Sequence, residues 1–497
     1  MNYISTRDNQ CAVSASFAIA NGISAEGGLF VPEAIPQTDA AFIESLVPLD
    51  YADRARKILP LFLTDYTADE LQAYTAAAYG AQFTGDTPAP VVKLKDNVSM
   101  LELWHGPTCA FKDMALQLLP HLLTGAAGRV LDGKESVILV ATSGDTGKAA
   151  LEGFKDVKGT RILVFFPEHG VSPMQKLQMM TQEGANVGVC GIEGNFDDAQ
   201  TGVKAIFTDP AVRAKLAAKG MCFSSANSIN WGRLVPQIVY YFSAYADLIA
   251  RGEIKNGDRV NFTVPTGNFG NILAGWYAMK MGLPVNKLIC ASNENDVLTE
   301  FLTTGRYNRR RPFHTTVSPS MDILISSNLE RLIFHLLHND SEETKRLFAA
   351  LKETGEYTVP DALLKEIRAV FAAGCCNDDE TKAAIADTYR TCGYLSDTHT
   401  GVAIRVYNSY RAATGDKTPT VIVSTASPYK FSKAVLGAIA DGQIKAENEF
   451  DMVRELEEKT GLPAPAPLKG LAGKAPRFNG VCGKEDMEDQ VYRLLGL

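Results

Sequence analysis

The sequence predicts an α/β protein built on mainly parallel sheets. Short runs of β-branched and aromatic residues alternate along the chain with segments of helical periodicity, which is typical of βαβ units. The runs are apolar on both sides of the strand, as expected of strands that helices cover on both faces. At 497 residues the chain is too long for one simple core, so we expect two or three domains.

The first half of the chain divides into two predicted units. Residues 1–95 carry mixed helical patterning and close on the proline-rich GDTPAPVV, so we predict an N-terminal domain there. Residues 96–230 are predicted to form a smaller α/β domain, in which one helix begins at Ser172-Pro173, a cap residue followed by proline. Its expected strands are SVILVAT (136–142), RILVFFP (161–167), NVGVCGI (186–192) and the run MCFSSAN from Met221.

The second half is predicted to hold a larger α/β domain over residues 231–440. A long amphipathic helix begins at Trp231, and a second helix begins at Phe269. Residues 300–395 are helical and charged, which indicates a helical insertion, and residues 441–497, with PAPAPLKG, are expected to form a loop-rich C-terminal extension. The expected strands are RVNFTVP (259–265), KLICASN (287–293) and TVIVST (420–425).

Charge and composition exclude several classes of protein. A net charge of -8 argues against a general nucleic-acid or anionic-membrane binder, which needs a basic face. No apolar run approaches the ~18 residues of a membrane span, and the start lacks the features of a signal peptide. The nine cysteines include no CxxC spacing, so we expect reduced thiols in a cytoplasmic protein. His335, His338 and Asp340 resemble a metal-ligand cluster but lie on an apolar helix, so we predict no metal site.

One lysine stands in an unusual setting. Lys112 lies within HGPTCAFKDMA, between Phe111 and Asp113, with small or apolar residues on both sides. A sheltered ammonium loses solvation, so its pKa falls and the free amine becomes a nucleophile. Amines of this kind form Schiff bases with aldehydes, including pyridoxal phosphate. The alternative is a lysine that extends to solvent from the start of a helix.

Two glycine-containing turns follow predicted strands, where ligands collect in α/β sheets. The first is ATSGDTG, which ends at Gly147. The second is VPTGNFGN (264–271), where Gly267 and Gly270 allow backbone N–H groups to approach an anion at a helix N-terminus. This turn suits a phosphate, although such glycines also serve only to form turns. GRVLDGKE (128–135) is not a nucleotide-binding loop, because Glu135 replaces the Ser or Thr that binds magnesium and the stretch precedes its strand.

Six segments together resemble the threonine synthase family in its long bacterial and fungal form. They are YISTR…GGLFVP, HGPTCAFKDMA, TSGDTG, SANSINWGRLVPQ, VPTGNFGNILAG and SPSMDILISSNLER, and the resemblance runs from Tyr3 to about Phe431. It implies fold type II of the pyridoxal-phosphate enzymes, with two open, twisted, mainly parallel sheets flanked by helices. It also implies conversion of O-phospho-L-homoserine and water to L-threonine and phosphate by γ-elimination and β-hydration, the last step of threonine biosynthesis.

The resemblance assigns roles around the cofactor, pyridoxal 5'-phosphate. Lys112 would hold the cofactor covalently and act as the catalytic base, and Thr425 would approach its pyridine nitrogen. The family usually has Thr-Ala-His-Pro at this place, and Ser427 stands in the histidine position, which leaves the local packing open. The cofactor phosphate would be bound by Gly267, Asn268, Phe269, Gly270 and Asn271.

The resemblance also assigns two substrate pockets. An ionised Asp145 pointed at two anions would repel them, so we expect its carboxylate to turn toward backbone amides. Arg233 suits a phosphate, although from the residues alone a surface ion pair with a carboxylate is the stronger interpretation. Tyr240 and Tyr241 are interpreted as helix packing. The substrate carboxylate would meet Ser143, Gly144, Asp145, Thr146 and Gly147, and the substrate phosphate would meet Asn227, Ser228 and Arg233.

Other functions remain as alternatives at this point. A serine or threonine dehydratase or a cysteine synthase shares the fold but lacks the second phosphate pocket and the long N-terminal unit. A catalytically silent phosphate-binding homologue is the alternative from another class, and the intact Lys112 argues against it. The expected partner is a small molecule, with no nucleic acid and no membrane, and the protein is expected to be a monomer or a homodimer.

Overall fold

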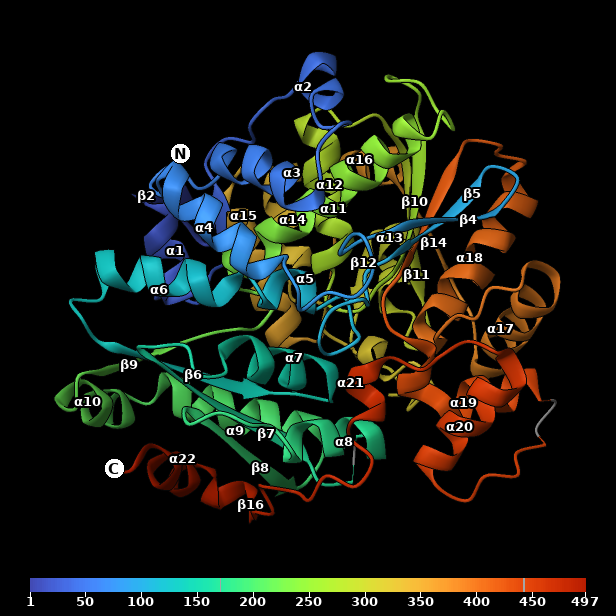
Figure 1. Ribbon diagram of the computed structural model, residues 1–497. Coiled ribbons are helices and arrows are strands. Elements are labelled where there is room, and N and C mark those ends of the chain that lie inside the picture. The colour runs from blue at the N-terminus through green and yellow to red at the C-terminus, as the bar shows by residue number, and fades with distance from the viewer. Residues whose placement is uncertain (170, 441–442) are drawn as a thin grey trace.

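The computed structural model describes residues 1–169, 171–440 and 443–497. Two lobes lie one above the other in Figure 1, each built on one sheet with helices on its faces. The six-stranded sheet has the order β14-β11-β10-β15-β5-β4, and all neighbours are parallel except β4 and β5. The five-stranded sheet has the order β16-β8-β7-β6-β9 and is entirely parallel. This architecture confirms the predicted fold class.

The larger lobe holds the six-stranded sheet. Strands β10, β11 and β15 coincide closely with the β-branched runs of the sequence, and each is buried along nearly its whole length. The strands of this sheet are β4 (Val91–Lys95), β5 (Val98–Glu102), β10 (Val260–Pro265), β11 (Val285–Ser292), β14 (Phe371–Cys375) and β15 (Thr420–Ser424). A separate two-stranded ribbon pairs β12 (Arg306–Asn308) with β13 (Glu356–Thr358).

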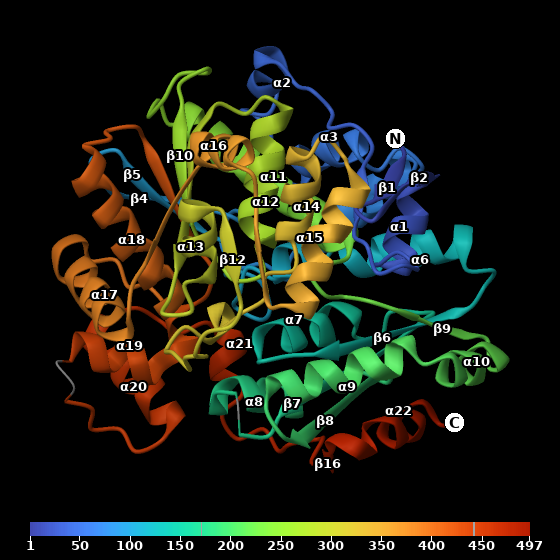
Figure 2. The same cartoon turned by 180° about the vertical axis from the view of Figure 1, so that it is seen from behind.

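The helices of this lobe cover both faces of its sheet (Figure 2). They are α11 (Trp231–Ala250), α12 (Gly270–Met281), α13 (Val297–Thr304), α14 (Leu329–Leu336), α15 (Ser341–Glu353), α16 (Asp361–Val370), α17 (Asp378–Cys392), α18 (Thr398–Thr414), α19 (Ser432–Ile439), α20 (Glu449–Thr460) and α21 (Ala466–Lys469). Two short 3-10 helices, η2 (Pro319–Met321) and η3 (Pro428–Phe431), lie in loops.

The smaller lobe holds the five-stranded sheet, and the last strand of the chain completes its edge. In both views β16 and α22, at the C-terminal end of the chain, lie beside β8. The strands are β6 (Glu135–Ala141), β7 (Thr160–Pro167), β8 (Val187–Glu193), β9 (Met221–Ser224) and β16 (Val481–Gly483). The helices are α7 (Asp145–Phe154), α8 (Pro173–Met180), α9 (Phe196–Thr208), α10 (Pro210–Ala218), η4 (Lys484–Asp486) and α22 (Met487–Leu495).

The N-terminal part of the chain packs on the larger lobe rather than standing apart. Its apolar residues share one core with α11, α12 and β10, and α11 itself is buried at 17 of its 20 residues. A three-stranded antiparallel sheet is formed by β1 (Tyr3–Ser5), β2 (Asp8–Val13) and β3 (Phe30–Pro32). The helices are α1 (Ala15–Asn21), α2 (Ala40–Glu44), α3 (Tyr51–Ile58), η1 (Leu59–Leu61), α4 (Ala68–Ala78), α5 (Asp113–Leu116) and α6 (Leu119–Val130).

The strand pairing departs from the predicted domain limits in three places. The expected limit at residue 95 falls between β4 and β5, which form an antiparallel pair in the larger sheet. The expected helical insertion contains β14, the edge strand beside β11. The expected loop-rich extension supplies β16 and α22 to the smaller sheet. In the described part of the chain, each helix is either too short or too polar to cross a lipid bilayer.

Candidate active site

Lys112 lies at the start of α5, between the two lobes. The preceding residue, Phe111, donates its N–H to the carbonyl of Thr425 at 2.8 Å, which fixes this segment against the end of β15. The lysine side chain is 8% exposed, and Nζ lies 3.2 Å from Asp145 Oδ2 and 3.3 Å from Ser320 Oγ. Burial lowers the pKa of Lys112, an effect that the carboxylate of Asp145 partly opposes. The lysine is therefore sheltered, as the sequence predicts.

Asp145 does not face backbone amides, so the predicted orientation is wrong. Its Oδ1 lies 2.6 Å from Lys430 Nζ and accepts a hydrogen bond from Gln175 Nε2 at 3.0 Å, while Oδ2 faces Lys112. Burial alone raises the pKa of such a carboxyl, but the ammonium groups of Lys430 and Lys112 outweigh it and hold the pKa well below its usual range. The repulsion that motivated the prediction is absent because Lys430 neutralises the carboxylate.

The GNFGN turn has the shape of an anion cradle. Phe269 is in the left-handed region at φ 62°, and a Cβ on Gly267 would lie only 2.7 Å from the carbonyl oxygen of Ser320. Ser326 Oγ holds the carbonyl of Gly267, and Asn328 holds that of Asn268. Among the described residues, the N–H groups from Gly267 to Asn271 have no hydrogen-bond acceptor. These donors stand at the N-terminus of α12, whose dipole favours an anion.

Asn271 adds a side-chain donor to this cradle. Tyr240 and Tyr241 donate to its Oδ1 at 2.7 and 2.8 Å, which fixes the orientation of the amide. Its Nδ2 is buried and has no acceptor in the part of the chain that the structure describes. The two tyrosines thus do more than pack. Because a buried tyrosine hydroxyl needs a hydrogen-bond partner, the presence of two tyrosines in a buried helix was the sequence signal that pointed to such a contact.

Ser320 connects the lysine to the cradle. Its hydroxyl contacts Lys112, and its carbonyl oxygen fills the space beside Gly267. The N–H of Ser320 donates to His399 Nε2 at 3.1 Å, and His399 Nδ1 lies 2.8 Å from Asp397 Oδ2. Sequence reasoning missed Ser320 and His399, although Ser320 belongs to the SPSMD stretch that carries part of the family resemblance.

Thr425 is the last residue of the run TVIVST and follows β15, next to the segment that carries Lys112. It is 5% exposed, and its carbonyl is the acceptor for the N–H of Phe111. The departure at Ser427 has a structural use, because its hydroxyl accepts the N–H of Tyr429 and caps η3. That short helix presents Lys430 to Asp145.

The SGDTG loop has fewer free donors than the sequence suggests. The N–H groups of Gly144 and Gly147 donate to Thr142 Oγ1 at 3.0 and 2.9 Å. Gly144 also has φ 135° and lies against the side chain of Gln175, so it serves the shape of the turn. Ser143 and Thr146 are only half-buried and remain the residues of this loop available to a ligand.

The SANSINWGR segment places a buried cation near the cradle. Arg233 is 3% exposed, and its Nη1 donates to the carbonyl of Ala226 at 2.6 Å. Its Nε has no acceptor, and no carboxylate within the described residues pairs with it, so the interpretation as a surface ion pair is wrong. Burial lowers its pKa to about 10. Half-buried Ser228 lies on the same segment, and its Cβ is 3.7 Å from where a Gly270 Cβ would stand.

Asn227 and Ser228 shape the loop that leads to Arg233. Asn227 is half-buried, and its carbonyl accepts the N–H of Asn230, the residue that caps α11. Ser228 Oγ accepts from Asn328 Nδ2 at 3.2 Å. Because Asn328 also holds the carbonyl of Asn268, one side chain fixes both the phosphate turn and the second loop.

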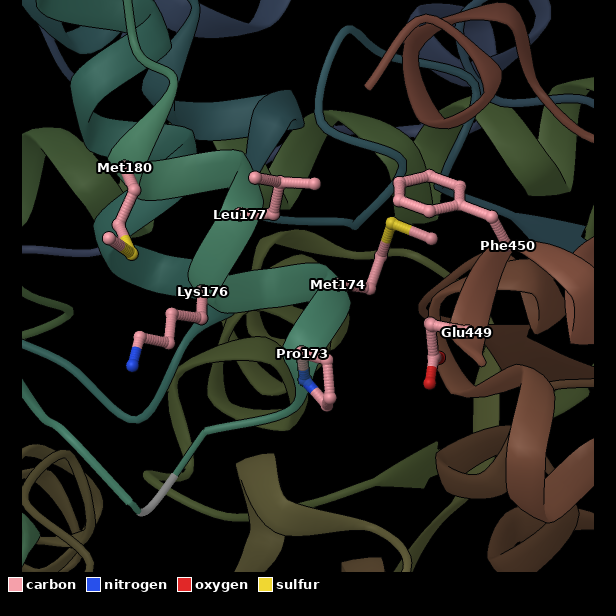
Figure 3. Close-up of a pocket in the computed structure, with 7 residues that line it drawn as sticks. All are labelled: Pro173, Met174, Lys176, Leu177, Met180, Glu449 and Phe450. Atoms are coloured by element: carbon pink, nitrogen blue, oxygen red, sulfur yellow. The ribbon is translucent and has the colours of Figure 1, made fainter. Parts of the chain in front are cut away.

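Two other features lie outside this site. A mostly apolar pocket of about 260 Å³ lies between α8 and α20. Figure 3 draws the residues that line it, and none of them is a predicted site residue. Gln175, on α8, instead reaches Asp145. The two histidines differ: His335 is hydrogen-bonded to Tyr277 at 2.8 Å and burial lowers its pKa to about 4, whereas His338 is exposed. Within the described residues, no three His, Cys, Asp or Glu side chains gather in a way that could hold a metal ion.

Three family models match successive parts of the chain. Residues 2–79 match the threonine synthase N terminus, residues 83–356 match the pyridoxal-phosphate dependent enzymes, and residues 400–484 match the C-terminal part of threonine synthase. The second model includes Lys112, the GNFGN turn and Arg233, and the third includes Thr425 and Lys430.

Individual relatives agree with these models. Threonine synthase-like 1 of Homo sapiens is 43% identical over 466 residues, which are 90% of this chain and 61% of that protein, so the chain spans less than two thirds of this relative. Threonine synthase of Pseudomonas aeruginosa is 41% identical over 93% of this chain and 96% of its own length. The crystal structure of pyridoxal-phosphate-bound threonine synthase from Brucella melitensis has a TM-score of 0.87 and 37% identity over 99% of both chains. Yeast threonine synthase has a TM-score of 0.88 and 32% identity over 100% of this chain and 99% of its own.

Proposed function

Because this chain belongs to the threonine synthase family of pyridoxal-phosphate enzymes, we propose that it converts O-phospho-L-homoserine and water into L-threonine and phosphate. It would act as a lyase, by γ-elimination and then β-hydration, and would complete threonine biosynthesis. The observation that carries the proposal is Arg233, a buried guanidinium that no described carboxylate neutralises. A dehydratase or a cysteine synthase does not need a second phosphate site of this kind.

The residues around Lys112 fit pyridoxal phosphate. Lys112 Nζ would hold the aldehyde carbon, the unpaired N–H groups of 267–271 would bind the phosphate, and the Thr425 hydroxyl would face the ring nitrogen. When bound, this cofactor withdraws electrons from the substrate and so lowers the cost of removing protons from carbon. A hydroxyl partner leaves the ring nitrogen largely unprotonated, unlike an aspartate partner.

Lys112 is the group that moves protons. Its lowered pKa increases the share of free amine near neutral pH, so Nζ can accept the Cα proton of the substrate and later return it. Burial keeps water away from this nitrogen and preserves the proton for return. The hydroxyl of Ser320 contacts Nζ and holds it in place. The carbonyl oxygen of Ser320 forms one side of the cradle, beside Gly267.

The two ends of the substrate would be held by different lobes. Ser143 and Thr146, beside the N-terminus of α7, would bind the carboxylate, and Arg233 with Ser228 and Asn227 would bind the phosphate. Once a Cβ proton is removed and phosphate leaves Cγ, Arg233 would retain the phosphate, where it helps to orient or deprotonate the water that adds at Cβ, and a proton returns to Cγ. The cytoplasmic location and the monomeric or homodimeric state expected from the sequence belong to this same proposal.

The test is an absorbance spectrum of the purified protein, followed by addition of O-phosphohomoserine and assays for threonine and phosphate. We expect a visible band from the bound cofactor and equal amounts of the two products. Lys112→Ala should remove both the band and turnover. Efficient deamination of serine with no turnover of O-phosphohomoserine would instead indicate a dehydratase, and a visible band without turnover of either would indicate a catalytically silent homologue.

A further inference from the structure

Asp145 is held from two sides by lysines that come from distant parts of the chain. Lys112 lies at the start of α5, and Lys430 lies in η3, more than 300 residues later. Lys430 is fully buried, and its Nζ contacts Asp145 Oδ1 at 2.6 Å and the carbonyl of Thr108 at 3.0 Å. Thr108 is in turn held by Asp113, which accepts from its N–H at 2.8 Å and from its hydroxyl at 2.7 Å.

Only one of these two lysines changes charge in the reaction. Lys112 must be a neutral amine before it takes a proton and an ammonium after it has done so. A buried carboxylate without a cation strongly prefers to be protonated, because an isolated ion is costly in a low dielectric. If Lys112 were the only cation beside it, Asp145 would lose its charge whenever Lys112 lost its own.

We propose that Lys430 is a positioning residue that keeps Asp145 ionised throughout the reaction, so that Asp145 can stabilise the Lys112 ammonium formed when the substrate Cα proton is transferred. The proton moves from substrate carbon to Lys112 Nζ and back, and Asp145 and Lys430 keep their own charges. This inference rests on the proposed function for its catalytic consequence, while the charge arrangement itself belongs to the structure.

The surroundings of Asp145 contain no other described cation that could take over the role of Lys430. Gln175 donates to Oδ1 but carries no charge, and Lys148, on the same helix as Asp145, contacts Glu152 and Gln182 instead. The remaining ionisable groups that face this cluster are Asp113 and Cys109 near Lys430, Arg233 near Lys112, and His399, which contacts Ser320.

The experiment compares pH titrations of the visible absorbance and of kcat in four cofactor-loaded proteins. These are the wild type, Lys430→Met, Asp145→Asn, and the double variant. In Lys430→Met we expect a new titration in both readouts as Asp145 becomes protonated, about tenfold lower kcat near pH 7 and a KM within about threefold of wild type. The double variant should lack the new titration, because the carboxyl is gone.

Asp145→Asn gives a second test if Lys430→Met fails to fold. It should move the absorbance titration, which reports the protonated nitrogen that links Lys112 to the cofactor, to lower pH by about one unit or more, because that cation loses its counter-ion. The matched control is Lys148→Met, which removes a buried lysine from the same helix and should add no titration. The proposal is overturned if Lys430→Met titrates like the wild type, or if Asp145→Asn leaves the absorbance titration unchanged. The absorbance arms need only bound cofactor, so they decide the charge arrangement even if the wild type forms no threonine.

Discussion

Replacement of Arg233 by methionine should stabilise the ligand-free protein while it impairs catalysis. Arg233 is buried without a carboxylate partner, and it is the third residue of α11, where the helix dipole disfavours a cation. Methionine has a similar length and no charge, so the variant removes the guanidinium with little change in packing. A residue kept for ligand binding at the expense of folding should show this opposite pair of effects.

The magnitude follows from the surroundings of the side chain. Burial lowers the pKa of Arg233 to about 10, against an ordinary value of about 12.5, and each pH unit corresponds to about 1.4 kcal/mol. The charged form is therefore disfavoured by about 3 kcal/mol, and loss of the hydrogen bond to the Ala226 carbonyl costs about 1 kcal/mol. The free energy of unfolding should rise by about 2 kcal/mol. Loss of about 3 kcal/mol of phosphate binding should lower kcat/KM by about 100-fold.

The assay is chemical denaturation with and without inorganic phosphate, together with steady-state kinetics. With the cofactor bound, phosphate at about 100 times its Kd should stabilise the wild type by about 2.7 kcal/mol and Arg233→Met by less than about 0.5 kcal/mol. The matched control is Arg54→Met, because Arg54 is equally buried but pairs with Asp247 at 2.6 Å, so its loss should destabilise the protein. A ligand-free Arg233→Met that unfolds more easily than the wild type, or that phosphate still stabilises fully, would refute the reasoning.

Two further changes probe the cradle and the lysine segment. Gly267→Ala places a Cβ 2.7 Å from the Ser320 carbonyl oxygen and should weaken cofactor binding by about tenfold in an equilibrium titration, whereas Gly437→Ala, which meets only an ordinary contact, should not. Burial raises the pKa of Asp113 to about 6, so this group stabilises the fold below about pH 4 and loses about 3 kcal/mol as pH rises through 6. Asp113→Asn should flatten the stability profile over that window, and identical profiles would contradict the assignment.

Strands were predictable where the sequence itself carries the signal. The runs at 136–142 and 161–167 fall within one residue of β6 and β7 at each end, because β-branched residues fill a strand buried on both faces. β14 has the sequence FAAGC and β16 has VCG, and neither run is long or branched enough to mark a strand. Their strand character comes from pairing with β11 and β8, which only the folded chain reveals.

The site divides in the same way. The sheltered setting of Lys112 and the shape of the GNFGN turn were predictable because each depends on local features, the neighbouring residues of the lysine and the glycines of the turn. The orientation of Asp145 was not, because its partner Lys430 lies 285 residues further along the chain. From the sequence, Asp145 was expected to be a single carboxylate beside two anions. In the folded chain Lys430 supplies a cation beside it, which removes the repulsion.

The distribution of charge explains how an acidic protein can take an anionic substrate. The whole chain carries a net charge of -8, yet the buried cluster of Lys112, Lys430, Arg233 and Asp145 has three cationic groups against one carboxylate. In a low dielectric this excess is costly when the site is empty and strongly attractive to phosphate and carboxylate groups that enter it. Because Asp145 neutralises one lysine, the remaining attraction is concentrated at Arg233 and at the helix N-termini of α7 and α12, where the three anionic groups of substrate and cofactor would be held. The same cost lowers the pKa of Lys112 and so increases the share of its free amine, the form that accepts the proton.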